Sequence, residues 1–408
     1  MTPSTNTEPI KPRSSWRMLG LMTLGMVILT IGGGFWWYFS DSDLEAVREQ
    51  ARLQGRPLSW SDMGLKPADP ERLRMWKRVT ELTEQLKSYQ TINYSPKKTG
   101  PVFKMWGPIP QEMRDYHQGL DGAAIAELTD LLDRLGDQPL VFHDQLTYTT
   151  NFPEIVTTRE LLRFTQERLI IAEGIEVGIW KKRMLSICHR FSSDTLMLFL
   201  VRNALIGTTI DSLTYRFAAL KQVDPSIASE ILTMTQTIHA NLLHALDGEF
   251  LMLLDCCTRR TAYTNEWYAQ LILRCGRYRV LSAYLDTQRE LQFLNNQGSL
   301  AWARTAEKKL IEEMKGIPNP SKILKGLLLP AWNTVIRMNQ KTILRGRLIA
   351  AELQGQPWPI DTFDATGAVL RPITRDGRII AAYSVGDDGI DQGGNEKKDH
   401  VFPLYAKP

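Results

Sequence analysis

The chain has 408 residues, a formal net charge of +4 at pH 7, 23% charged residues and 43% hydrophobic residues. This is an ordinary globular composition, and the length is sufficient for two or three domains. The basic residues are spread along the chain, whereas a surface that binds nucleic acid requires a concentrated basic face. We therefore expect no nucleic-acid partner.

An uncharged apolar run over Met18–Phe39 predicts one transmembrane helix, because ~33 Å of helix spans the hydrocarbon core of a bilayer. The run closes on a cluster of aromatic residues, 35–39, which favour the headgroup boundary. The run is preceded by the basic residues Lys11, Arg13 and Arg17. It is followed by the acidic residues Asp41, Asp43 and Glu45. This asymmetry predicts a cytoplasmic tail over 1–17, an anchor over 18–39 in the inner membrane, and a periplasmic remainder. A cleaved secretory signal is the alternative, although such signals are usually shorter and end in small residues.

The segment 40–150 is predicted to be a connector of helices and loops. Residues 43–53 can continue as a helix until Gly55-Arg56-Pro57 ends it. Asp69-Pro70-Glu71 is typical of a helix start, and apolar residues then recur at helical spacing as far as Leu86. Four prolines predict a long loop over 91–110, which a short helix over 123–135 follows.

The segment 151–355 is predicted to be an α-helical bundle or array. Its pattern indicates helices around 161–170, 184–206, 226–246, 265–274, 280–293 and 300–314, and a last long helix from Asn319-Pro320 to about Gly355. The 184–206 helix is apolar on most sides and is therefore expected to be central. No other apolar run approaches membrane length, so we expect a single membrane pass.

Two sets of side chains in this segment have simple structural interpretations. The four cysteines lie in apolar helical contexts, which favours buried free thiols over disulfides: Cys188, Cys256, Cys257 and Cys275. The basic run 181–183 is interpreted as a solvated helix face.

The segment 356–408 is predicted to be a small tail with a β-hairpin and a loop. Residues 368–372 and 379–384 can pair over a turn at Thr374-Arg375-Asp376-Gly377. Beyond them, Asp387, Asp388 and Asp391 lie among glycines, and Asp399 could close a site from beyond the loop. Such a loop can offer oxygen ligands to a hard cation such as Ca²⁺, although the spacing is not that of an EF-hand. A solvated acidic turn is the alternative interpretation.

This tail resembles the C-terminus of type II secretion major pseudopilins, as found in uncharacterised membrane-anchored planctomycete and verrucomicrobial proteins. The matching stretches are WPIDTFD over 358–364, YSVGDDG over 383–389 and DQGG over 391–394. The resemblance implies a calcium site at Asp388, Asp391 and Asp399, with Asp387 as a further candidate. Three features depart from a pseudopilin: the apolar run has no glutamate, the large helical segment has no counterpart, and Gln392 replaces an acid.

The predicted fold class is mainly α, with a single N-terminal transmembrane helix, a large helical bundle or array, and a small C-terminal hairpin and loop. The predicted function is a non-catalytic binding or scaffolding role in the cell envelope, linked to secretion machinery through the tail. Its expected partners are the membrane and other envelope proteins. The alternative is an envelope hydrolase that uses His244, Asp247 and Glu249 as general acid–base groups in the helical segment.

Overall fold

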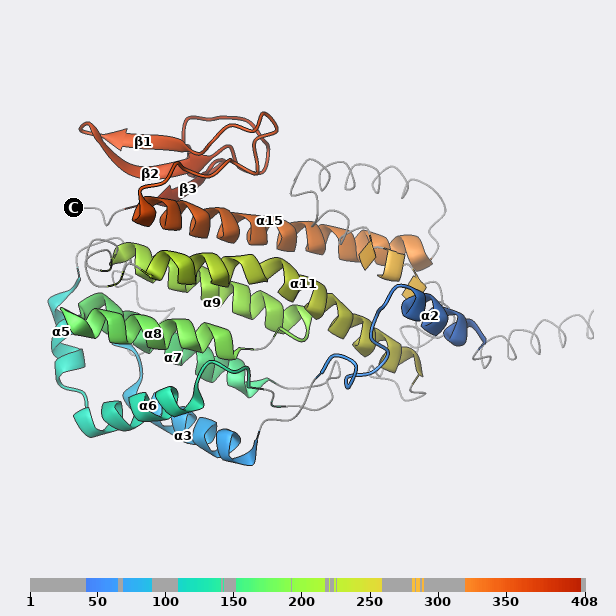
Figure 1. Cartoon of the computed structure of the whole chain (residues 1–408), viewed down its shortest axis with the longest axis horizontal. Helices are drawn as coiled ribbons and strands as arrows, with labels where there is room; N and C mark the ends of the chain where they lie inside the picture. Colours follow the sequence, from blue (N-terminus) through green and yellow to red (C-terminus); the bar gives the residue numbers. More distant parts are fainter. Residues whose placement is uncertain are drawn as a thin grey trace, which may run out of the picture.

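The computed structural model is mainly helical, with one small antiparallel sheet near the C-terminus (Figure 1). The structure describes residues 42–64, 69–89, 109–140, 142, 152–191, 193–216, 220, 224, 226–258, 281–282, 284–286, 288–289 and 320–404, without the side chains of 42, 43, 239, 256–258 and 320–333. The predicted helical fold class is confirmed for these residues. Several predictions lie outside them, namely the membrane segment 18–39, the helices at 265–274 and 300–314, most of that at 280–293, and the thiols of Cys256, Cys257 and Cys275.

The part of the chain before residue 150 contributes α2 (Ser42–Leu53), α3 (Pro70–Leu86), α5 (Gln111–Gln118) and α6 (Gly122–Leu135). The predicted starts are confirmed, because the Asp69 carboxylate accepts a hydrogen bond from the Glu71 N–H and Asp121 caps α6 in the same way. Arginines from two other elements then bind the carbonyls at the end of α6. Arg72 donates to the Leu135 oxygen at 3.2 Å, and Arg190 donates to the Gly136 oxygen at 2.5 Å.

The helical body consists of α7 (Pro153–Ile171), α8 (Ile175–Arg190), α9 (Leu196–Tyr215), α11 (Ile227–Thr258) and α15 (Pro320–Gln354). The prediction of one continuous helix over 184–206 is wrong, because α8 and α9 are separate helices. Phe191 leaves the helical conformation and forms an isolated bridge with Leu140. The Thr195 hydroxyl then caps α9 by accepting from the Leu198 N–H at 3.3 Å.

Helix α9 occupies the centre of the body, where it packs against α7, α8, α11 and α15. In the part of the chain that the structure describes, it is the one helix long and apolar enough to cross a membrane, although half of its apolar window is buried inside the protein. A buried central helix can have the same length and apolar composition, so these features are weak evidence for a membrane span. An apolar helix of this length was not predicted, because Arg202 and Asp211 interrupt the apolar runs in the sequence.

The long helices α11 and α15 lie side by side along the body (Figure 1). Their close approach depends on Gly346, where a Cβ atom would lie 2.4 Å from the Thr235 side chain. One continuous hydrophobic cluster includes side chains from α2 and α3, from the helical body and from the tail, for example Val79, Leu246 and Phe402. The connector and the tail therefore share a core with the helical body.

The interpretation of 181–183 as a solvated face is wrong for Lys181, whose side chain is only 4% exposed. Its ammonium group forms ion pairs with Asp224 at 2.5 Å and with Glu230 at 2.9 Å. The hydrogen bond from Lys181 is the main reason that the pKa of Asp224 falls to about 2. The buried and free thiol expected for Cys188 is confirmed.

The tail contains β1 (Arg371–Arg375), β2 (Arg378–Ser384) and β3 (His400–Pro403), in the order β1-β2-β3. The predicted hairpin is confirmed, but its first strand lies at 371–375 and not at 368–372. The turn is correspondingly shorter and places Asp376 and Gly377 at positive φ. The sequence did not predict β3, which pairs antiparallel with β2. The sheet lies over the end of α15 (Figure 1), and the acidic loop connects β2 to β3.

Candidate functional site

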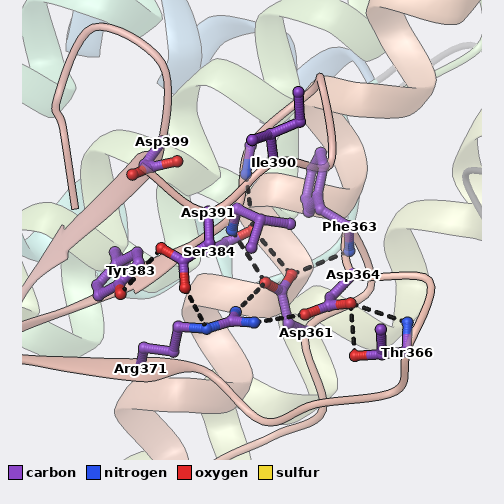
Figure 2. Close-up of polar contacts among 12 residues, drawn as sticks. Asp361, Phe363, Asp364, Thr366, Arg371, Tyr383, Ser384, Ile390, Asp391 and Asp399 are labelled. Atoms are coloured by element: carbon purple, nitrogen blue, oxygen red, sulfur yellow. Dashed lines mark hydrogen bonds and ion pairs between the residues drawn. The ribbon is translucent and has the colours of Figure 1, made fainter. Parts of the chain in front are cut away.

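Arg371, at the start of β1, is the centre of a polar network that involves three aspartates (Figure 2). Its guanidinium lies 2.5 Å from Asp364, 3.0 Å from Asp391 and 3.6 Å from Asp361. The hydrogen bond from Arg371 is the main reason that the pKa of Asp364 falls to about 2, and the same bond raises the pKa of Arg371. The planar guanidinium thus joins β1 to two other segments of the tail, the stretch 361–364 and the loop at Asp391.

Asp361 is the fully buried member of this network, with no exposed surface. Its carboxylate accepts hydrogen bonds from the Phe363 N–H at 2.9 Å, the Ser384 hydroxyl at 2.8 Å and the Val385 N–H at 3.0 Å. A buried carboxylate requires such donors, because an unpaired buried charge is strongly destabilising. Asp361 therefore fastens the segment after α15 to the end of β2.

Asp391, one of the predicted calcium ligands, is already bonded within the protein. Besides Arg371, it accepts hydrogen bonds from the Tyr383 hydroxyl at 3.2 Å and the Gly393 N–H at 2.9 Å. The pKa of Tyr383 is raised, first by burial and then by the bond to Asp391. These contacts give Asp391 a structural role in holding the loop against the sheet.

Asp387 and Asp388 point to different partners. Asp387 forms a 3.2 Å hydrogen bond with His400 and a 3.9 Å ion pair with Arg337 of α15. Asp388 accepts from the Ile390 N–H at 2.9 Å and from the Gln392 amide at 2.7 Å. Asp387 therefore connects the tail to α15, whereas Asp388 organises its own loop.

Asp399, just before β3, is only 3% exposed. One carboxylate oxygen, Oδ2, accepts from the Gly394 N–H at 2.8 Å and the Asn395 N–H at 2.9 Å. The other, Oδ1, is buried and has no hydrogen-bond donor among the described residues. The loop is closed here because Gly386, at φ +69°, lies so near the Lys398 carbonyl that a Cβ would approach its oxygen to 2.1 Å.

The four predicted ligands therefore do not form one carboxylate cluster. Across the residues that the structure describes, no group of three or more His, Cys, Asp and Glu side chains is placed to hold a metal ion. Figure 2 shows Asp399 apart from Arg371 and its partners. The donor set nevertheless fits a cation in part, because the buried Asp399 Oδ1 and the buried Gln392 Oε1 are both oxygens without a hydrogen-bond partner in the described structure.

Four residues of this site were not predicted from the sequence: Asp361, Asp364, Arg371 and Gln392. The two aspartates belong to the WPIDTFD stretch, so the resemblance contained a signal for them. Gln392 was interpreted as the loss of a ligand. Arg371 had no recognisable signal, because its partners are brought to it only by the hairpin and the loop.

The alternative acid–base set in the helical body is divided among separate contacts. His244 bonds to Asp194 at 2.9 Å, and Glu249 accepts from the Leu196 N–H at 3.1 Å. Asp247 accepts from Arg56 at 3.2 Å and from Gln288 at 2.6 Å. Burial raises the pKa values of both Asp247 and Glu249. His244 and Glu249 both fasten the connection between α8 and α9 to α11, whereas Asp247 binds Arg56 and Gln288.

No protein-family model, curated protein or solved structure matches this chain.

Proposed function

We propose that this chain is a single-pass membrane protein whose exported part has a non-catalytic binding or scaffolding role in the cell envelope. Residues 18–39 would anchor it in the inner membrane, with basic residues on the cytoplasmic side and acidic residues on the periplasmic side. The helical body would serve as the scaffold. The C-terminal tail would be a cap docked on α15, stabilised by one Ca²⁺ ion.

The contacts of the tail support a structural rather than a chemical role for its acidic residues. Asp361, Asp364 and Asp391 are bonded to Arg371 or to backbone N–H groups, and Asp387 reaches Arg337 on α15. Side chains that are bonded in this way connect segments of the chain.

The observation that carries the calcium proposal is the Oδ1 atom of Asp399, a buried carboxylate oxygen that has no donor in the described structure. A carboxylate oxygen in this position is normally paired with a proton donor or a cation. Ca²⁺ binds carboxylate and carbonyl oxygens, which a tightly turned glycine-rich loop can supply. The resemblance to the pseudopilin tail points to the same loop.

The calcium proposal is tested by thermal unfolding of the full-length chain in detergent, with millimolar Ca²⁺ or with a chelator. We expect Ca²⁺ to raise the Tm of the wild type and to have a much smaller effect on Asp399→Asn. Asp376→Asn is the matched control, because Asp376 lies in the exposed hairpin turn outside the loop. Equal Tm values of the wild type in Ca²⁺ and in chelator would refute the calcium site.

The membrane topology is tested separately by a reporter fused after Pro408. We expect the activity of a periplasmic reporter and no activity of a cytosolic one. The opposite pattern would remove the case for an exported scaffold. The hydrolase alternative has less support, because His244, Asp247 and Glu249 are each engaged in hydrogen bonds that join other parts of the chain to α11.

A further inference from the structure

We propose that Gln392 is a neutral cation ligand beside Asp399, and that Asp388 holds its side-chain amide in the ligating orientation. This inference rests on the calcium site proposed above and changes its expected ligands. Asp391 and Asp387 leave the ligand set, because Arg371 and His400 already occupy their carboxylates. Gln392, which the sequence presented as a lost acid, enters it.

The orientation of the Gln392 amide follows from its hydrogen bond. Its Nε2 atom donates to the Asp388 carboxylate at 2.7 Å. A carboxylate is an acceptor, so the reversed amide would place two acceptor oxygens against each other. The carbonyl Oε1 must therefore point the other way, where it is buried and has no donor among the described residues.

A backbone hydrogen bond joins Asp399 to the chain two residues after Gln392. Gly394, two residues after Gln392, donates its N–H to Asp399 Oδ2 at 2.8 Å. This bond leaves Asp399 Oδ1 as the second buried oxygen without a donor in the same loop. One short loop thus contains two oxygens, a carboxylate and an amide carbonyl, that each require a positive partner.

The charge of this ligand pair predicts the strength of the site. One carboxylate and one neutral carbonyl attract a divalent cation less than two or three carboxylates, and backbone carbonyls and water would complete its shell. We expect a dissociation constant of about 10⁻⁴–10⁻³ M, the range of extracellular calcium modules. A site of this strength is occupied at millimolar calcium.

Two substitutions at one position test the assignment by calorimetric Ca²⁺ titration of the full-length chain in detergent. Gln392→Met keeps the length of the side chain but removes its oxygen, so we expect at least tenfold weaker binding. Gln392→Glu restores an acid that Asp388 repels in the metal-free loop. A cation relieves this repulsion, so we expect tighter binding than in the wild type. Asp376→Asn should bind as the wild type does.

The outcomes separate this inference from the proposal on which it depends. If the wild type does not bind Ca²⁺, both fail. If the wild type binds and Gln392→Met binds equally well, the Gln392 assignment fails and the Asp399 site remains. If Gln392→Met lowers the Tm in chelator, the substitution also destabilises the metal-free protein, and its weaker binding no longer tests the ligand. Gln392→Glu then tests the assignment: tighter Ca²⁺ binding supports it, and binding tenfold weaker than in the wild type overturns it.

Discussion

Glu167 and His117 form a 2.9 Å hydrogen bond in the interior of the helical body, where their side chains are 1% and 0% exposed. The same oxygen of Glu167 accepts from the Tyr89 N–H at 2.7 Å. Tyr89 lies three residues after the end of α3, and His117 lies on α5. One carboxylate on α7 therefore joins the chain just after α3 to α5.

We predict that Glu167→Ala destabilises the protein by about 3–5 kcal/mol, because it leaves a buried histidine and a half-buried backbone N–H without their acceptor. The free energy of unfolding can be measured by denaturant titration of the full-length chain in detergent. Glu84→Ala is the control, since Glu84 is exposed on α3 and should change the stability by less than about 0.5 kcal/mol. Equal effects of the two substitutions would contradict a special role for Glu167.

A second prediction concerns Arg371, whose guanidinium contacts Asp361, Asp364 and Asp391. Arg371→Ala should lower the free energy of unfolding of the tail by about 1.5–3 kcal/mol, the range for hydrogen bonds to charged groups. Hydrogen exchange of the β1 and β2 amides measures this loss locally. Arg371→Lys should recover only part of it, because an ammonium cannot reproduce the planar fork.

Arg375 provides the control for Arg371, because it ends the same strand and its side chain is exposed. Arg375→Ala should leave amide protection in the tail unchanged. If Arg371→Ala also left it unchanged, the three aspartates would not depend on the guanidinium, and the assigned structural role would be wrong.

Features that depend on local sequence could be predicted. The Asp69-Pro70 and Asn319-Pro320 helix starts and the hairpin turn each depend on a few neighbouring residues. The break between α8 and α9 was not predicted, because Phe191 fits the apolar pattern of a continuing helix. In the structure it instead forms a bridge with Leu140. Its backbone conformation depends on a contact with a distant residue.

The position of the candidate site in the chain could be predicted from the sequence, but the contacts of its side chains could not. Acidic residues and glycines identify the loop from 386 to 399 in the sequence. Asp391 pairs with Arg371, which lies outside the loop, whereas Asp399 accepts hydrogen bonds from the backbone of the loop itself. The burial of Lys181 was missed for the same reason, since Asp224 and Glu230 are brought to it by the packing of α11 on the body.

A third prediction concerns the stability of the tail at low pH. The pKa of Asp364 is lowered to about 2 in the folded protein, mainly by its hydrogen bond from Arg371, from an ordinary value of 3.8. The folded state therefore binds fewer protons at Asp364 than the unfolded state does. Its contribution to stability is fully present above about pH 4 and is lost as the pH falls toward 2.

Hydrogen exchange of the β1 and β2 amides between pH 5 and pH 2 measures this contribution. Asp364→Asn removes the titrating group, so the tail of this variant should be less stable at pH 5 and should lose less stability on acidification. Asp376→Asn should follow the wild type, because Asp376 lies in the exposed turn. A wild-type pH dependence in Asp364→Asn would assign the acid sensitivity to another group.

The last prediction concerns Gly248 in α11, which allows the connection between α8 and α9 to approach this helix closely. A Cβ at this position would lie 1.7 Å from the Asp194 carbonyl oxygen and 2.9 Å from its carbonyl carbon. Both are backbone atoms, so a rotamer change cannot relieve the clash. Gly248→Ala should therefore displace the connection, weaken the Asp194–His244 bond, and destabilise the protein by about 1–3 kcal/mol.

Gly207, in the middle of α9, is the matched control, since a Cβ there would have nothing within 4 Å. Gly207→Ala should stabilise the protein by about 0.5–1 kcal/mol, because alanine loses less backbone entropy in a helix. Denaturant unfolding of the two variants should therefore shift in opposite directions. A stabilising Gly248→Ala would mean that the connection does not pass over α11 at this point, and the placement of Asp194 beside His244 would have to be abandoned.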